Sequence, residues 1–268
     1  MSFAAEWLAL REPYDGQARN REVLAAVTAR FANEKAISIV DLACGTGSTL
    51  RAVSPHLDGR QSWRLTDNDL GLLARAAASN APARASVTTM PIDLARDLEA
   101  VLDGAVDLVT TSALLDLVSA EWLERLVVEA AARRLPVYAA LTYDGRVSLE
   151  PADPLDETII AAFNRHQRTN KGFGPALGPA AASAAIAQFA GVDYAVTSGT
   201  SDWVFRPDDR DIQYEVLSGF AAAARELRDV SLSDVVGWLT RRRDVAAAGR
   251  AHLRVGHVDL FAQPIARR

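Results

Sequence analysis

The chain has 268 residues, of which 49% are hydrophobic and 24% are charged, and its formal net charge is -5. This composition is ordinary for a globular protein, and the acidic balance argues against broad electrostatic binding to nucleic acid or to an anionic membrane. Cys44 is the only cysteine and the four histidines show no ligand spacing, so we predict neither a disulfide framework nor a metal site.

The N-terminal 34 residues are predicted to be helical. Two helices are expected over 3–10 and 17–31, and Pro13 and Gly16 mark the break between them. The first residues lack a basic segment followed by an apolar core, and no run of about 18 apolar residues occurs in the chain. We therefore expect a cytoplasmic protein without a membrane partner.

The stretch 37–50 organises the rest of the chain. Its first residues are apolar and rich in β-branched side chains, as in a buried parallel strand. Asp41 lies close to the end of that strand, a turn with Gly45 and Gly47 follows, and a helix is predicted over 48–53. Glycine adopts backbone angles that a Cβ forbids and lets the chain pass close to a ligand. A strand, a glycine turn and a helix in this order form the first unit of a Rossmann-type half.

The sequence Asp-Leu-Ala-Cys-Gly-Thr-Gly at 41–47 resembles motif I of the class I methyltransferases that depend on S-adenosylmethionine (SAM). That motif has an acidic residue, two or three small or apolar residues and then G-x-G. The resemblance implies SAM as the cofactor, with the backbone of the turn against its amino-acid part. The cofactor contacts that it implies within the motif are Asp41, Ala43, Gly45, Thr46 and Gly47.

A second acidic position follows the strand predicted over 61–66. Asp67 lies 20 residues after Gly47, the spacing expected of a carboxylate that accepts hydrogen bonds from the ribose hydroxyls. The alternative role for an aspartate here is to cap the helix predicted over 70–79, and we assign that role to Asp69. Asn68, between the two, is predicted to lie beside the cofactor.

Later loops supply the remaining predicted cofactor contacts. After the strand over 85–90, Asp93 and Leu94 fit the place where the family commonly binds adenine, and Asp93 is also suited to cap the helix over 95–102. The strand over 106–112 ends at Ser112, and Ser112 and Ala113 should pass close to SAM.

Two residues of the N-terminal segment are further candidates for the cofactor. Tyr14 is suited to cation–π contact with the sulfonium, and Arg19 to pairing with the methionine carboxylate. The alternative is a half-buried tyrosine and a surface arginine on helices that pack against the sheet.

The acceptor site is less well defined by the sequence. The segment after Ser112 resembles motif IV of the family but lacks its Asn/Asp-Pro-Pro-Tyr/Phe sequence, which counts against methylation of a nucleobase or a glutamine. Asp116 either faces the acceptor or begins a helix.

A helix over 120–134 and a strand over 136–142 continue the β/α alternation, and 143–179 then interrupts it as a lid-like insertion with a helix over 156–167. Within this insertion Asn164, Arg165 and His166 are candidates for substrate contact. His166 is predicted as a general base or hydrogen-bond donor, the alternative being a structural or solvated histidine.

The C-terminal part predicts two strands around a Ser-Gly turn within 192–205, helices over 209–228 and 231–248, and a last strand over 253–262. Arg241, Arg242 and Arg243 are predicted to form a solvated helix face. Together the elements predict one α/β domain over 1–268 with a Rossmann-like, doubly wound, seven-stranded sheet. The sheet is expected to be mostly parallel with an antiparallel last strand, and 1–34 to form a helical cover.

We predict a SAM-dependent methyltransferase that transfers a methyl group to a small-molecule acceptor by in-line displacement. Two alternatives remain open at this stage. An NAD(P)-dependent oxidoreductase shares the half-fold but requires a fuller G-x-G-x-x-G and a catalytic dyad that we do not locate. A non-catalytic protein of the SAM fold is the second, because methyl transfer requires no obligatory side chain.

Overall fold

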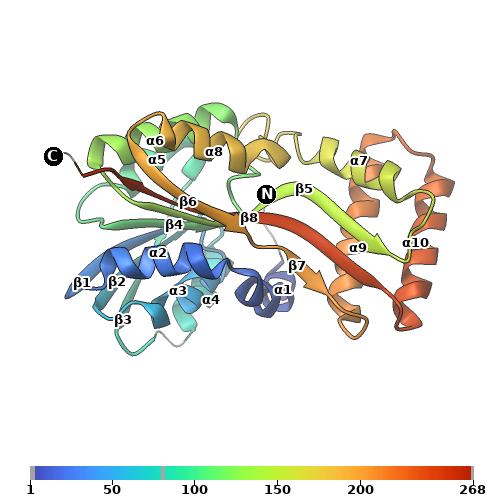
Figure 1. Ribbon diagram of the computed structural model, residues 1–268, viewed down its shortest axis with the longest axis horizontal. Helices are drawn as coiled ribbons and strands as arrows, with labels where there is room; N and C mark the ends of the chain where they lie inside the picture. The colour runs from blue at the N-terminus through green and yellow to red at the C-terminus, as the bar shows by residue number, and fades with distance from the viewer. Residues whose placement is uncertain (1–3, 80–81, 267–268) are drawn as a thin grey trace.

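The computed structural model describes residues 4–79 and 82–266 of the chain. In this part of the chain one mixed sheet has helices against both of its faces (Figure 1). The strand order is β3-β2-β1-β4-β5-β8-β6, and β7 pairs with β8 outside this path. Neighbours from β3 to β5 pair in parallel, whereas β8 lies antiparallel between β5 and β6. The predicted Rossmann-like sheet with an antiparallel last strand is therefore confirmed.

The elements between 36 and 133 lie close to their predicted bounds. The strands are β1 (Ala36–Leu42), β2 (Arg60–Asp67), β3 (Ala85–Pro91), β4 (Leu108–Ser112), β5 (Val137–Glu150), β6 (Tyr194–Thr200), β7 (Trp203–Phe205) and β8 (His252–Pro264). The α-helices are α1 (Ala5–Ala18), α2 (Arg21–Phe31), α3 (Ser48–Val53), α4 (Leu70–Ala78), α5 (Leu94–Val101), α6 (Ala120–Arg133), α7 (Asp156–His166), α8 (Ala181–Ala190), α9 (Arg210–Leu227) and α10 (Leu232–Ala247). None of these described helices is long and apolar enough to span a membrane.

The N-terminal helices are divided differently from the prediction. Helix α1 continues through Pro13 and Gly16, so the predicted break there is wrong. A proline inside a helix costs about 3 kcal/mol, and the packing of α1 against β7 offsets that cost. The break lies at Asn20, whose side chain accepts hydrogen bonds from two backbone N–H groups in the first turn of α2. Residue 3, where the first helix was predicted to begin, lies outside the described residues.

A second lobe extends from the sheet and was not predicted as a unit. Strand β5 continues to Glu150, and β8 pairs with it as far as His252. Helices α7, α9 and α10 pack around this long strand pair and β7, at the right of Figure 1. We call this part, residues 143–166 and 203–258, the outer lobe. The expected insertion at 143–179 thus begins inside β5 and shares its core with the C-terminal helices.

The outer lobe also contains a buried ion pair. Arg242 of α10 is 3% exposed, so the predicted solvated position is wrong for this residue. Its guanidinium bonds to the carboxylate of Asp156 at the start of α7, which also accepts a hydrogen bond from Trp238 Nε1 at 2.8 Å. Its neighbour Arg241 pairs with Asp153 at the surface. The three arginines therefore do not form one solvated face.

Candidate functional site

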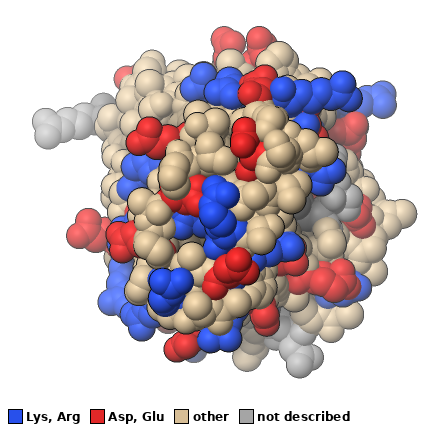
Figure 2. Space-filling model, turned by 90° about the vertical axis from the view of Figure 1, so that its right-hand side faces the viewer, with Lys and Arg blue, Asp and Glu red and all other residues tan. Residues whose placement is uncertain are grey.

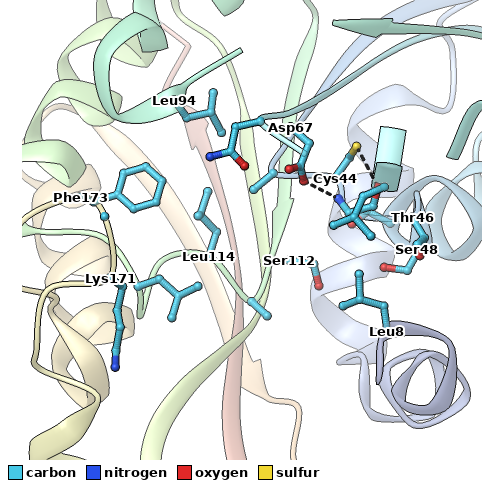
Figure 3. Close-up of a pocket in the computed structure, with 18 of the residues that line it drawn as sticks. Leu8, Cys44, Thr46, Ser48, Asp67, Leu94, Ser112, Leu114, Lys171 and Phe173 are labelled. Atoms are coloured by element: carbon cyan, nitrogen blue, oxygen red, sulfur yellow. Dashed lines mark hydrogen bonds between the residues drawn. The ribbon is translucent and has the colours of Figure 1, made fainter. Parts of the chain in front are cut away.

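A cavity of about 150 Å³ lies at the carboxyl ends of β1, β2 and β4. We call it the first cavity (Figure 3). The order of the sheet reverses between β1 and β4, and ligands of open α/β sheets bind at such a switch point. Helix α1 and the loop 171–173 close the cavity on its outer sides. Of the two N-terminal helices, only α1 contributes to its wall, and α2 packs against β6 and β8.

The glycine turn after β1 is fixed to the end of β2. Gly45 has φ +54°, and its backbone N–H donates to Asp67 Oδ2 at 2.9 Å (Figure 3). A Cβ at position 45 would lie 3.2 Å from Leu8 Cδ1 on α1, so the Leu8 side chain would have to shift, and the positive φ would strain any residue other than glycine. Asp67 Oδ1 accepts from the backbone N–H of Asp69 at 3.0 Å. These bonds hold the Asp67 carboxylate in the cavity wall.

Two alanines in the wall have left-handed backbone angles. Ala43 has φ 51° and Ala113 has φ 52°. Non-glycine residues adopt this conformation at a cost of about 1–3 kcal/mol, and they concentrate at functional sites. Both residues follow strand ends, at β1 and β4, and both contribute to the first cavity.

Asp41 lies beneath this wall and is fully buried. Its Oδ1 accepts from Thr110 Oγ1 at 2.8 Å, whereas Oδ2 has no partner in the described part of the chain. Burial raises the pKa of this carboxyl group to about 7, because the charged form loses its hydration. An unpaired buried acceptor is expected where a ligand or water completes a site.

Most of the predicted cofactor residues meet in the first cavity. They are Ala43, Gly45, Thr46, Asp67, Asn68, Asp93, Leu94, Ser112 and Ala113. Asp93 also caps α5 by accepting from the backbone N–H of Ala95, and Asp69 caps α4, as predicted. Gly47 lies behind the turn and packs toward Leu65 and Ala76.

Direct contacts of Tyr14 and Arg19 with the cofactor are not supported by this geometry. Tyr14 points into the outer lobe, where its hydroxyl donates to Asp209 Oδ1 at 2.8 Å. Arg19 is buried below the cavity and reaches it only through Ser112, with Nη2 at 3.4 Å from Ser112 Oγ. Tyr14 lies on a different face of α1 from Arg11 and Asp15, which line the cavity, and Arg19 caps the C-terminal end of the helix.

An ion pair of α1 in the cavity wall was not predicted from the sequence. Arg11 and Asp15 are both buried, and Arg11 Nε donates to Asp15 Oδ2 at 2.9 Å. Their spacing of four residues places them on one helix face. The break predicted at Pro13 obscured this signal, because it placed the two residues in a loop. Lys171 and Phe173, from the loop after α7, also contribute to the wall.

Comparison with known proteins gives a family match over part of the chain. Residues 39–135 match the model of a family described as a methyltransferase domain, a region that runs from β1 to just past α6 and contains most of the first cavity. For this part of the chain, the match agrees with the predicted resemblance to the class I SAM-dependent methyltransferases. It favours SAM as the cofactor over the NAD(P)-dependent alternative.

Several solved structures resemble this chain over most of its length. A cyclopropane-fatty-acyl-phospholipid synthase-like protein from Lactobacillus casei has 16% identity and a TM-score of 0.52, over 94% of this chain and 98% of that one. A cyclopropane synthase from Mycobacterium tuberculosis has 10% identity and a TM-score of 0.46, over 90% and 82%. A SAM-dependent methyltransferase from Thiobacillus denitrificans, in complex with S-adenosylhomocysteine (SAH), has 14% identity and a TM-score of 0.45, over 100% of both chains. The first of these likenesses shows a shared fold. No curated protein matches the chain.

A larger cavity of about 530 Å³ adjoins the first one. We call it the second cavity. It lies between α1, α7, α9 and the outer parts of β5 and β8, and its wall is largely apolar and aromatic. The two cavities share four wall residues, which are Arg11, Ala113, Leu117 and Lys171. The spaces are therefore adjacent, with α1 covering both.

The predicted substrate residues divide between this cavity and the surface. Asp116 and His166 contribute to its wall. Asn164 instead supports the wall, because its Oδ1 accepts from the Tyr143 hydroxyl at 2.7 Å. Arg165 pairs with Asp229 at the surface. Successive helical residues point about 100° apart, so 164–166 could not all face one cavity.

Proposed function

We propose that this methyltransferase binds SAM in the first cavity and methylates a small molecule held in the second. The observation that carries the proposal is the shared wall of Arg11, Ala113, Leu117 and Lys171. SAM supplies an electrophilic methyl carbon on a sulfonium centre. The chain's own residues orient the acceptor and exclude water, and correct orientation alone can lower a barrier by roughly 7–11 kcal/mol.

The residues of the first cavity fit SAM. Asp67 presents a fixed carboxylate that can accept hydrogen bonds from two ribose hydroxyls. Asp93 and Leu94 line this cavity and are assigned to the adenine. We assign the methionine carboxylate to Arg11 in place of Arg19, because Arg11 lines the cavity.

The size and surroundings of the second cavity favour a small acceptor. Pockets for small molecules generally have volumes of about 300–1,000 Å³, and this one measures about 530 Å³. On the end of the molecule formed by the outer lobe, positive and negative side chains are interspersed (Figure 2). A nucleic acid would require a continuous basic surface, and this face does not present one.

His166 is assigned a positioning role. Its Nε2 lies 2.8 Å from Glu226 Oε2 and its Nδ1 lies 3.2 Å from Lys171 Nζ, so both ring nitrogens are engaged. We therefore propose that His166 holds Lys171 at the boundary of the two cavities and does not transfer the proton. The loop 171–173 would then act as the lid over the first cavity.

Gly219→Phe is expected to abolish methylation without changing cofactor binding. Gly219 lines the second cavity from α9, and a Cβ at this position meets no atom within 4 Å, so the cavity wall has room for a side chain to begin here. The assay follows label from methyl-tritiated SAM into the low-mass fraction of a metabolite extract. SAH affinity is measured by calorimetry.

The matched control is Gly219→Ala, which adds one methyl group at the same position. We expect the alanine variant to retain labelling and both variants to bind SAH within about threefold of the original chain. Full labelling by Gly219→Phe, or label found only in macromolecules, would contradict the proposal.

A further inference from the structure

Five aromatic side chains from five different elements surround the second cavity. They are Trp7 of α1, Tyr143 of β5, Phe163 of α7, Trp203 of β7 and Phe220 of α9. Tyr143 meets Phe163 edge to face with the ring centroids 5.4 Å apart, and Phe163 meets Phe220 at 4.6 Å. Aromatic pairs of this kind bind a further planar ring better than their buried area alone would suggest.

Asp116 contributes an unsatisfied acceptor to this apolar wall. Asp116 is 5% exposed, and its Oδ1 has no hydrogen-bond partner within the described ranges 4–79 and 82–266. Neither nearby cation donates to this oxygen in the described part of the chain: Arg11 Nε and Nη2 bond to Asp15, and Lys171 Nζ lies 3.2 Å from His166 Nδ1. A buried acceptor without a donor is costly, so a ligand that supplies a donor here gains affinity.

Asp116 lies close to the boundary between the two cavities. It lies in the loop after β4, between Ala113 and Leu117, and both of these neighbours belong to the boundary of the two cavities. Asp116 is therefore a carboxylate of the second cavity that lies next to the boundary with the first cavity, where the cofactor is proposed to bind.

Building on the proposed function, we propose that the acceptor is a planar aromatic compound with a phenol-type hydroxyl, and that Asp116 is the catalytic base. The hydroxyl oxygen bonds to the methyl carbon as the carbon–sulfur bond breaks and its electron pair passes to sulfur. The hydroxyl proton passes to Asp116. The products are the methyl ether, SAH and a protonated Asp116, which then releases its proton to water.

The protonation behaviour of the cavity agrees with this role. Burial raises the pKa of Asp116 to about 6, against smaller opposing effects of backbone amides, Arg11 and Lys171. A base in this range suits a phenol, whose pKa is about 10, better than an aliphatic alcohol.

His257 of β8 is a further candidate base in the wall. Its Nδ1 lies 3.1 Å from the Val255 carbonyl, and burial lowers its pKa to about 3. It therefore stays neutral and does not compete for the proton. The remaining titratable groups that face this cavity are Tyr143, His166, Lys171, Glu215 and Arg11.

The test uses the SAH-bound protein and two probes that differ only in the donor, 2-naphthol and 2-methoxynaphthalene. Tryptophan fluorescence reports binding, since Trp7 and Trp203 line the cavity. We expect the original chain to bind 2-naphthol at least about tenfold more tightly, in line with one hydrogen bond to a charged group. Asp116→Leu should reduce this preference to about one, and the surface variant Asp229→Asn should retain it.

A second readout is methyl transfer from SAM to 2-naphthol between pH 5 and 8. The carboxylate must be deprotonated to act, so the rate should rise with pH through about 6 and then level off. Asp116→Asn should lower the rate by about 10²–10⁴-fold and remove this inflection.

The outcomes separate this inference from the proposed function. Equal binding of the two probes, no binding of either, or an Asp116→Leu variant that keeps the preference would overturn the inference while SAH binding persists. Failure to bind SAH at all would instead contradict the proposed function.

Discussion

Asp67→Ala is expected to weaken SAH binding about 100-fold, which corresponds to roughly 2.7 kcal/mol. The carboxylate can accept hydrogen bonds from two ribose hydroxyls, and hydrogen bonds to charged groups contribute about 1.5–3 kcal/mol each. It also holds Gly45 through the 2.9 Å bond from the backbone N–H, so its loss loosens the glycine turn as well. Calorimetric titration with SAH measures the change.

Asp69→Ala is the matched control, two residues away. Asp69 caps α4 by accepting hydrogen bonds from Gly71 and Leu72, so its loss should lower the free energy of unfolding by about 1 kcal/mol. SAH affinity should stay within about threefold of the original value. Equal losses of affinity in the two variants would show that Asp67 acts only through the local backbone.

Arg242→Met is expected to lower the free energy of unfolding by about 3–5 kcal/mol. The substitution leaves Asp156, which is 9% exposed, as a buried charge without its partner, and such losses have this magnitude. Because Asp156 joins the start of α7 to α10, we expect the outer lobe to lose the stability. Urea denaturation followed by tryptophan fluorescence gives the value, since Trp238 contacts Asp156.

The control for this prediction is the adjacent residue on α10. Arg241 also forms an ion pair, with Asp153, but its side chain is 50% exposed. Exposed pairs contribute about 0–1 kcal/mol, so Arg241→Met should change stability by less than about 1 kcal/mol. A similar loss in both variants would mean that burial does not distinguish the two pairs.

The sheet could be predicted from the sequence because its signals are local. The β-branched run before Asp41, the glycine turn and the later β/α repeats each specify one element and its neighbour. The outer lobe could not be predicted in the same way. Gly145, with φ +90°, lies within a shift of register between β5 and β8, and the sequence around it resembles a turn. A bulge inside a long strand and a turn between two strands share this glycine signal.

The two cavities also differ in how far their residues could be predicted from the sequence. Asp67 and Asp93 were predicted because the family resemblance and a fixed spacing place them at strand ends. Arg11 and the aromatic wall of the second cavity were not predicted. Trp7 and Trp203 lie almost 200 residues apart, yet their ring centroids are 6.2 Å apart. Periodicity reports which face of an element is apolar, but not which distant element covers that face.

A crystal structure of the complex with SAH would show where the cofactor lies. We expect the ribose to lie against Asp67 and the sulfur to face the boundary of the two cavities, beside Arg11, Ala113 and Leu117. SAH bound with its sulfur directed away from the second cavity, or bound outside the first cavity, would contradict this expectation.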